Sequence, residues 1–498
     1  MDPQLTLLVI VVYFGLLFLI SLFTGREVSE QTFFTANRNA PWFVVAFGMI
    51  GASLSGVTFI SVPGKVGFDH WAYLQLVFGY LLGYVVIAQV LLPLYYRLNL
   101  TSIYGYLQER YGRRAYRSGA LLFMLSRVIG SSLRLYIVAL VLQLAICDYL
   151  GIPFPLTVLL SIALIFLYTF RGGIKTVLWT DTLQTVAMLA GAGIVVGLIV
   201  QRMDLSAGEA LRLLADSEYT RVWVWDWAAG NHFVKQFFSG ALITIVMTGL
   251  DQDMMQKNLT CRNLRDAQKN VYTFSAILVL ANLLFLSLGA LLYLYGEHTG
   301  LIEPVFEGAC KFRVHTGGET ICYDSTDKLF PLLSLQYLGP LAGIVFVLGV
   351  IAAAYSSADS ALTALTTSFC VDLLDFERRD DTQRKLHQRR LVHVGFALLL
   401  FVVILVFRWI NDQTVIDAIF IAAGYTYGPL LGLFTFGMAS RRIVPDTVIP
   451  WLCLASPVLS YLIDLISARL GFSWGFLILL LNALLTLAGL WAFSKRAA

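Results

Sequence analysis

Long apolar runs follow one another along nearly the whole chain, and this feature limits the possible folds more than any other. Hydrophobic residues make up 58% of the 498 residues and charged residues only 13%. A run of about 20 apolar residues crosses a bilayer as a helix, and soluble domains do not contain many such runs. We find about thirteen of them and predict an all-α polytopic membrane protein. The predicted spans are residues 5–23, 43–62, 74–96, 118–146, 154–170, 177–200, 238–256, 271–295, 341–369, 391–410, 415–438, 447–466 and 474–493.

The orientation follows from the loops between these runs. The run 5–23 has no positive charge before it and no small-residue cleavage site after it, so we interpret it as a retained helix. About 23 lysines and arginines fall in one set of alternate loops and roughly 10 in the other. Basic loops stay in the cytoplasm. We therefore predict a multi-pass protein of the cell (inner) membrane, with the N-terminus outside and the C-terminus in the cytoplasm.

The run 341–369 contains an unusual polar stripe. At helical spacing, small and hydroxyl residues from Ala353 to Thr363 share one face, and Asp359 lies at its edge. Polar groups at membrane depth are costly and mark ion or substrate paths. Packing of small residues between helices explains the serines equally well. The carboxylate of Asp359 favours a cation site.

Two runs look interrupted. Glycines and serines cluster in the middle of 43–62, and Thr248 and Gly249 precede a polar end in 238–256. Such clusters weaken a helix and let backbone carbonyls turn toward a ligand. Two broken spans, five apart in order, are typical of inverted-repeat transporters with a midplane site. A close packing groove at Gly51 and Ser55 is the alternative for the first break.

Several functions find no support in the sequence. It contains no P-loop, no GxGxxG in a strand–helix context, no HExxH and no nucleophile–base constellation. We therefore expect no enzyme and no ATP-driven pump in this chain. Cys310 and Cys322 share one outer loop, where either a disulfide or two free thiols would fit.

Six segments, in this order, carry a resemblance to a known family. They are FFTANRNAPWF, GASLSGVTFISVPGKV, TSIYGYLQERYGRR, YTFRGGIKTVLWTDTLQ, QDMMQKNLTCRN and AAAYSSADSAL. Together they make the chain similar to the sodium/solute symporter family, and within it to bacterial sialic acid and sugar symporters. The resemblance implies one transporter domain, 1–498, with a LeuT-type core of two inverted five-helix repeats. The repeats would be 43–200 and 238–438, with an extra helix at 5–23 and two more in 447–493.

The resemblance also implies a shared sodium site where the broken helix 43–62 crosses 341–369. Carried over residue by residue, the backbone carbonyls would come from Gly51, Leu54 and Ala353, and the hydroxyls from Ser356 and Ser357. A hard cation held by unwound backbone and hydroxyls fits this chemistry.

A second ion site, for sodium or a proton, is implied at Asp181 together with Asp359 and Ser360. Two carboxylates cannot both stay charged in a low dielectric unless a cation lies between them. Asp359 therefore completes a sodium site, carries a proton, or pairs with Arg127 or Arg134.

The substrate pocket of the family lies beside the shared sodium site. The candidates here are Ser53, Ser55, Thr58, Tyr73, Gln75, Arg127 and Arg134. Either arginine would supply a guanidinium for a carboxylate, or both would be partners of Asp181 and Asp359. Gly130 stands where sialic acid carriers place an arginine. The segment QDMMQK is expected to be a solvated helix end.

These inferences predict a sodium-coupled secondary symporter. It would import a small polar solute (sialic acid, a sugar or a related organic acid) by alternating access, with Na+ as the coupling ion. The solute, sodium and the lipid bilayer are the expected partners, with no nucleic acid and no obligatory protein partner. A proton-coupled carrier of the same fold and a transporter-like solute sensor are the alternatives.

Overall fold

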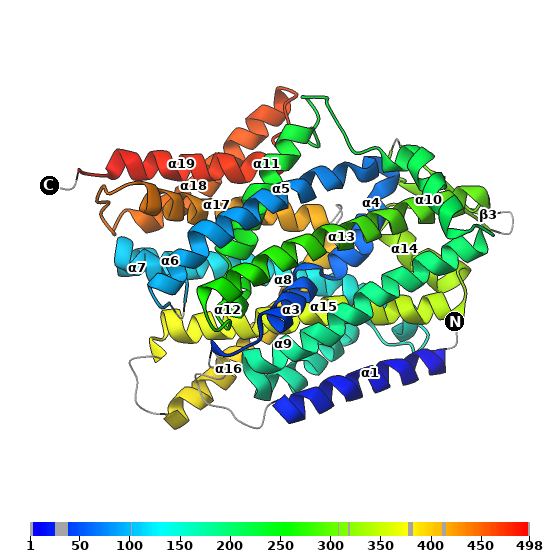
Figure 1. The fold of residues 1–498 in the computed structure, drawn as a ribbon, viewed down its shortest axis with the longest axis horizontal. Coiled ribbons are helices and arrows are strands. Elements are labelled where there is room, and N and C mark those ends of the chain that lie inside the picture. Colours follow the sequence, from blue (N-terminus) through cyan, green and yellow to red (C-terminus); the bar gives the residue numbers. More distant parts are fainter. Residues whose placement is uncertain are drawn as a thin grey trace.

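The computed structural model describes residues 3–24, 38–100, 102–306, 308–316, 319–376, 382–410 and 415–496. Over these ranges the chain is almost entirely helical, and its long helices lie side by side (Figure 1). Nine helices of this described part are long and apolar enough to cross a membrane, or ten if one bent pair counts as a span. The all-α prediction is thus confirmed, and the count of thirteen spans stays a prediction.

The first half of the chain forms a bundle that begins with a peripheral helix. Its elements are α1 (Pro3–Thr24), α3 (Trp42–Ser53), α4 (Gly56–Asp69), α5 (Tyr73–Val86), α6 (Leu92–Arg97), α7 (Gly105–Arg110), α8 (Arg113–Leu142) and α9 (Phe154–Arg202). The predicted spans 154–170 and 177–200 both fall within α9. They correspond to its apolar stretches Phe154–Leu167 and Thr176–Arg202.

The second half adds the remaining helices and a small sheet. The helices are α10 (Ala207–Asp216), α11 (Phe233–Thr244), α12 (Gln252–Asn258), α13 (Leu264–His298), α14 (Leu329–Leu332), α15 (Pro340–Ser368), α16 (Thr382–Ile410), α17 (Val415–Ala439), α18 (Ile449–Arg469) and α19 (Ile478–Phe493). The strands β1 (Ile302–Pro304), β2 (Phe312–Thr316) and β3 (Glu319–Tyr323) form an antiparallel sheet in that order.

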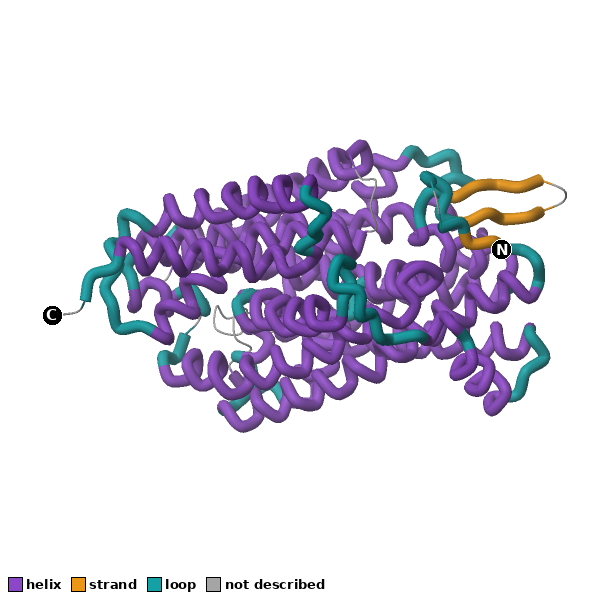
Figure 2. Tube along the Cα trace, turned by 90° about the horizontal axis from the view of Figure 1, so that it is seen from above, coloured by secondary structure: helices purple, strands orange, loops and turns teal. Residues whose placement is uncertain are grey.

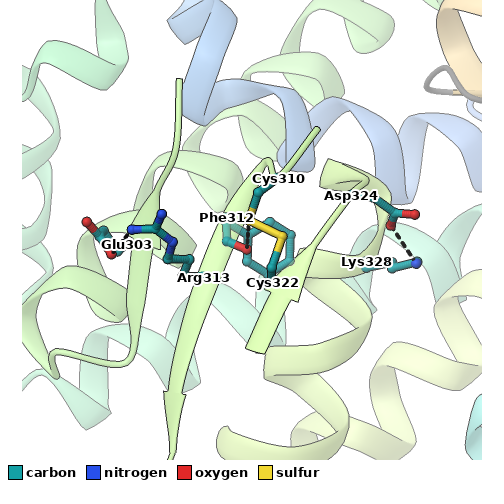
Figure 3. The surroundings of a disulfide bond; sticks show 7 residues. All are labelled: Glu303, Cys310, Phe312, Arg313, Cys322, Asp324 and Lys328. Atoms are coloured by element: carbon teal, nitrogen blue, oxygen red, sulfur yellow. Dashed lines mark hydrogen bonds and ion pairs between the residues drawn. A yellow bond between two sulfur atoms is a disulfide. The ribbon is translucent and has the colours of Figure 1, made fainter. Parts of the chain in front are cut away.

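The sheet carries the disulfide. Cys310 and Cys322 are bonded, with their Cα atoms 5.7 Å apart, and the bond closes the β2–β3 hairpin (Figure 3). The hairpin projects beyond the helices at the end of the molecule where α1 begins, and the C-terminus lies at the opposite end (Figure 2). The loop that was predicted to be outside thus shares an end with the start of α1.

Burial separates the centre of the bundle from its rim. In the most apolar 18-residue stretch of the span that contains α15, 78% is buried, against 22% in that of α18. α15 packs against α9, α8 and α3, so its polar stripe lies inside the protein. The exposed apolar faces of α1, α16 and α18 suit contact with lipid, because lipid tails are as apolar as these side chains.

Both predicted interruptions are present. The helix over 42–69 breaks at Leu54 and Ser55, whose backbones are not helical (ψ 79° and 173°), and separates into α3 and α4. The helix over 233–258 widens into a π-helical turn, Ile245–Gly249, and then bends by 70° between α11 and α12. The glycines that predicted these breaks lie three residues before the first one and one residue before the second.

Candidate ion and substrate sites

The break between α3 and α4 leaves backbone groups without helical partners. A helix that ends cannot bond its last carbonyls internally, and the helix that begins cannot bond its first N–H groups. Leu54 is half-way through this break, and its N–H still donates to the carbonyl of Ile50 at 2.7 Å. The start of α4 has no side-chain cap. Carbonyls and N–H groups at this break are therefore available to a ligand.

The polar stripe of α15 faces this break. Ala353, Ser356 and Ser357 are buried. The hydroxyl of Ser357 donates to the carbonyl of Ala52 at 3.2 Å and to that of Ala353 at 3.5 Å. The structure therefore brings α3 and α15 together where the shared sodium site was expected. The carbonyl of Ala52 was not among the predicted ligands, although it lies between two that were.

Gly51 allows three helices to meet at this point. A Cβ atom added there would lie 2.4 Å from Oγ1 of Thr185 and 2.9 Å from Oγ of Ser356. Thr185, on α9, donates to the carbonyl of Phe47 at 2.9 Å and to that of Asp181 at 2.8 Å. The sequence analysis did not single out Thr185. Glycine is required here for close approach rather than for an unusual backbone conformation.

Asp181 is buried beside the serines of α15, but its basic partner is not the predicted one. The hydroxyl of Ser356 donates to its Oδ1 at 2.6 Å, and Nζ of Lys257 donates to its Oδ2 at 2.8 Å. Lys257 and Asp181 are both fully buried. Of the two alternatives for the arginines of α8, pairing with Asp181 is not the one found, because α12 turns inward after its bend and carries Lys257 to the carboxylate.

Asp359 lies further along the same stripe. Its Oδ1 accepts the N–H of Ser360 at 2.5 Å, and the Ser360 hydroxyl is buried without a hydrogen-bond partner. Tyr13 of α1 lies next to Gln184 and within electrostatic range of Asp359 and Asp181. The amide of Gln184 is also buried without a partner. Tyr13 therefore lies near Asp359 and beside Gln184. Neither Tyr13 nor Gln184 was among the predicted site residues.

A cavity opens on the other side of the first break. Most of the predicted substrate residues line it, namely Ser53, Ser55, Thr58, Tyr73, Arg127 and Arg134. Residues that were not predicted complete its wall, among them Tyr80, Tyr84, Thr244, Thr248, Asn282 and Phe420. The Oδ1 atom of Asn282 is buried without a hydrogen-bond partner. An asparagine and two threonines inside apolar runs are a signal that would have found these residues.

Gln75 does not line this cavity, unlike the other predicted substrate residues. Its Nε2 donates to the carbonyls of Ala72 and Asn231 at 3.2 and 3.1 Å, and its Oε1 accepts the N–H of Val224 at 3.2 Å. Gln75 is two residues from Tyr73, which does line the cavity, and two helical residues point about 200° apart. Its side chain therefore anchors the loop before α11.

The two arginines of α8 have different surroundings. Arg127 pairs with Asp253, and its Nη1 lies 3.6 Å from Oδ2 of Asp251. Arg134, two turns along, has neither a hydrogen bond nor an ion pair within the described part of the chain, and its Nε is buried without a partner. Arg134 is therefore the cation of this cavity wall whose charge is left for a ligand.

α12 is not the solvated helix end that was expected. Every one of its residues, Gln252–Asn258, is buried. Asp251 caps its start by accepting the N–H groups of Asp253 and Met254, and Tyr427 donates to the same carboxylate at 2.6 Å. The expectation failed because α12 bends into the bundle instead of continuing along α11.

These features define a class of protein. Two broken helices, buried carbonyls and hydroxyls where the first of them meets α15, and an adjacent polar cavity are typical of a LeuT-type secondary transporter. The chain belongs to the sodium:solute symporter family, whose model matches residues 33–445. It is therefore a multi-pass membrane transporter that couples a small solute to sodium.

Individual relatives and solved structures agree with this assignment. The sodium/sialic acid symporters NanT of Aliivibrio fischeri and SiaT of Proteus mirabilis are 26% and 24% identical to the chain. Each match covers 84% of this chain, and 80% and 81% of the relative. The human sodium/iodide cotransporter is 25% identical over 86% of this chain and 64% of its own length.

Among solved structures, a substrate-bound, outward-open Na+-coupled sialic acid symporter superposes with a TM-score of 0.80 at 19% identity. The match covers 99% of both chains. Mhp1, a nucleobase-cation-symport-1 family transporter in a closed conformation, superposes with a TM-score of 0.55 at 17% identity, over 93% of this chain and 95% of its own. The LeuT-type fold of five-plus-five inverted repeats is thus confirmed.

Proposed function

We propose that this transporter imports a small polyhydroxylated carboxylic acid of the sialic acid class together with sodium, by alternating access. The observation that carries the proposal is Arg134. A buried guanidinium without a counter-ion is costly, and a carboxylate matches its paired N–H donors in a bidentate fashion. A substrate that brings the missing negative charge would remove this cost at the moment of binding.

The rest of the cavity suits a ligand with many hydroxyl groups. Ser53, Ser55 and Thr58 lie at the first break, opposite hydroxyl-bearing residues of α5 and α11. Tyr73 and Tyr80 share a hydrogen bond of 3.1 Å across the wall. The uncapped start of α4 adds N–H donors, and the positive end of its helix dipole favours an anion. The sialic acid symporters among the relatives support the same substrate class.

We assign the coupling sodium to Gly51, Leu54, Ala353, Ser356 and Ser357. These residues supply carbonyl and hydroxyl oxygens where the broken helix meets α15, and the carbonyl of Ala52 lies within the same contact. We assign Asp181, Asp359 and Ser360 to a second ion site, for sodium or a proton. Its support is the group of buried oxygens that α9 and α15 contribute there.

We place the chain in the inner membrane as one transporter domain, with the N-terminus outside and the C-terminus in the cytoplasm. The excess of basic residues in one set of loops supports this orientation. The disulfide lies at the same end as the start of α1, as expected if that end faces an oxidising compartment. The repeats would run over 43–200 and 238–438, each opening with a broken helix.

Uptake into proteoliposomes tests the proposal. An inward sodium gradient is expected to drive accumulation of sialic acid, whereas potassium or a pH gradient alone is not. Arg134→Met is expected to remove binding of the acid, and wild type is expected to bind its methyl ester at least tenfold more weakly than the acid. Lys235→Met is the matched control, because Lys235 is also buried but lies outside the cavity.

Two results would contradict this assignment. One is equal affinity of wild type for the acid and its ester, because a guanidinium that holds a carboxylate must discriminate between them. The other is sialic acid uptake by Arg134→Met at the wild-type rate. If a neutral solute accumulates with the same sodium dependence, sodium coupling stands and the proposed substrate class is wrong.

A further inference from the structure

Lys257 is a buried cation that the proposed transport cycle has not yet used. It lies on α12 and is fully buried, as is the Asp181 carboxylate to which it donates. The other oxygen of that carboxylate is occupied by the hydroxyl of Ser356, a proposed sodium ligand. Both oxygens of Asp181 are therefore engaged, and one of them by a positive charge at the edge of the ion site.

An ammonium group and a sodium ion compete for the same carboxylate. Two cations held at one buried carboxylate repel each other strongly, because the low dielectric screens little. We infer that Lys257 is a tethered competitor of sodium. Its ammonium occupies Asp181 when the ion is absent, and it gives the carboxylate up when sodium enters. This inference rests on the proposed coupling-sodium site, whose ligand Ser356 also donates to Asp181.

The chain offers the displaced ammonium a second partner. Asp253 lies four residues before Lys257 on the same helix, a spacing at which an acid and a lysine meet. The two residues already interact electrostatically, and Asp253 also pairs with Arg127. Lys257 thus has one partner on α9 and another within α12.

This exchange would connect the ion to a moving element. α12 packs against α3 and α15, the two helices of the shared sodium site, and follows the bend of the second broken helix. With Lys257 on Asp181, α12 is tied to α9. With Lys257 on Asp253, that tie is absent. Sodium occupancy is therefore transmitted to the segment that follows the second break.

Lys257→Met tests the inference in the purified full-length transporter. Sodium is titrated in choline chloride by calorimetry and by thermal unfolding. We expect the sodium Kd to fall at least tenfold, because the competitor is gone. We also expect a lower Tm without sodium that recovers at saturating sodium, because Asp181 then depends on the ion for its counter-charge. Lys257→Arg keeps a cation that grips the carboxylate with two N–H donors, and should raise the sodium Kd several-fold.

Lys235→Met is the control. Lys235 is equally buried but donates to the carbonyls of Ala229 and Ser473, both at 3.2 Å, at the outer end of α11. Its loss should lower the Tm equally at all sodium concentrations and leave the sodium Kd unchanged.

The outcomes separate the inference from the proposal beneath it. An unchanged or higher sodium Kd in Lys257→Met overturns the inference. If the wild type binds sodium in the same experiment, the proposed site is unaffected by that result. If Lys257→Met does not fold, an unchanged Kd in Lys257→Arg overturns the inference in the same way. Absence of sodium binding in wild type overturns the proposed site itself.

Discussion

The two broken helices of this transporter satisfy their freed backbone groups in opposite ways. At the second break, side chains of the protein supply the partners. Tyr95 and Tyr104 donate to the carbonyls of Gly249 and Leu250 at 2.8 and 3.0 Å, and Asp251 caps α12. At the first break the start of α4 has no side-chain cap, and the side chain that meets the end of α3 is the hydroxyl of Ser357, a proposed sodium ligand. An inverted repeat can therefore carry one break that is closed by the protein and one that is left for ligands.

Charge follows the same division. The first break contains no ionisable residue of its own between Trp42 and Gly64, and the carboxylate near it, Asp181, comes from α9. The second break lies beside Asp251, Asp253 and Lys257, all buried and paired. Buried ion pairs are weak sources of stability but costly to break. The second break is therefore suited to a fixed structural role, and the first break is suited to a site that binds and releases a ligand.

The largest effect on this comparison is expected from Asp251→Ala. The change removes the cap of α12, the acceptor of the Tyr427 hydroxyl and a counter-charge of Arg127. We expect the free energy of unfolding to fall by about 3 kcal/mol or more, measured as a large drop in Tm in detergent. A drop of only a degree or two would mean that the second break is not closed by its own side chains.

Ser357→Ala should have a smaller effect of a different kind. The hydroxyl donates to the carbonyl of Ala52 and is a proposed sodium ligand. We expect the sodium Kd to rise about tenfold, which is about 1.4 kcal/mol, with a Tm in saturating sodium within a few degrees of wild type. Ser460→Ala, which removes another buried hydroxyl bonded within its own helix, serves as the control. An unchanged sodium Kd would remove Ser357 from the site.

Gly51→Ala probes the space at the first break. Its new Cβ would lie too close to Thr185 of α9 and Ser356 of α15, so α3 must shift away from both helices. We expect a rise of about threefold in the sodium Kd, equal to about 0.7 kcal/mol. Adding Thr185→Ala should recover part of this loss, because it removes the nearest contact. If the double variant has the same sodium Kd as Gly51→Ala, the contact with Thr185 does not limit ion binding.

Gln75→Ala should have the smallest effect on function. The side chain makes three hydrogen bonds, two of which join α5 to the loop before α11, and each is worth about 1 kcal/mol. Stability should therefore fall by up to about 3 kcal/mol, while the substrate Kd stays within twofold of wild type. A large loss of substrate affinity at unchanged stability would show that Gln75 contributes to the substrate site.

Much of the fold was predictable because bilayer spans are long and their signal is strong. The predicted spans 154–170 and 177–200 merge into α9, and parts of 43–62 and 74–96 fall within one helical stretch, Gly56–Arg97. Both breaks were found from glycine and hydroxyl clusters. The prediction that Asp181 and the α15 serines share one region also needed only spacing and the family resemblance. The role of each residue in ion or substrate binding stays a prediction.

The partners of the charged groups were decided by tertiary structure alone. Arg127 and Arg134 lie two turns apart on the same helix, yet within the described part of the chain one is paired and the other is not. Lys257 reaches Asp181 across 76 positions of sequence only because α12 bends by 70°. Residue types and periodicity determine which groups face inward. Which inward-facing charge meets which depends on the angle between helices, and no local pattern encodes that angle.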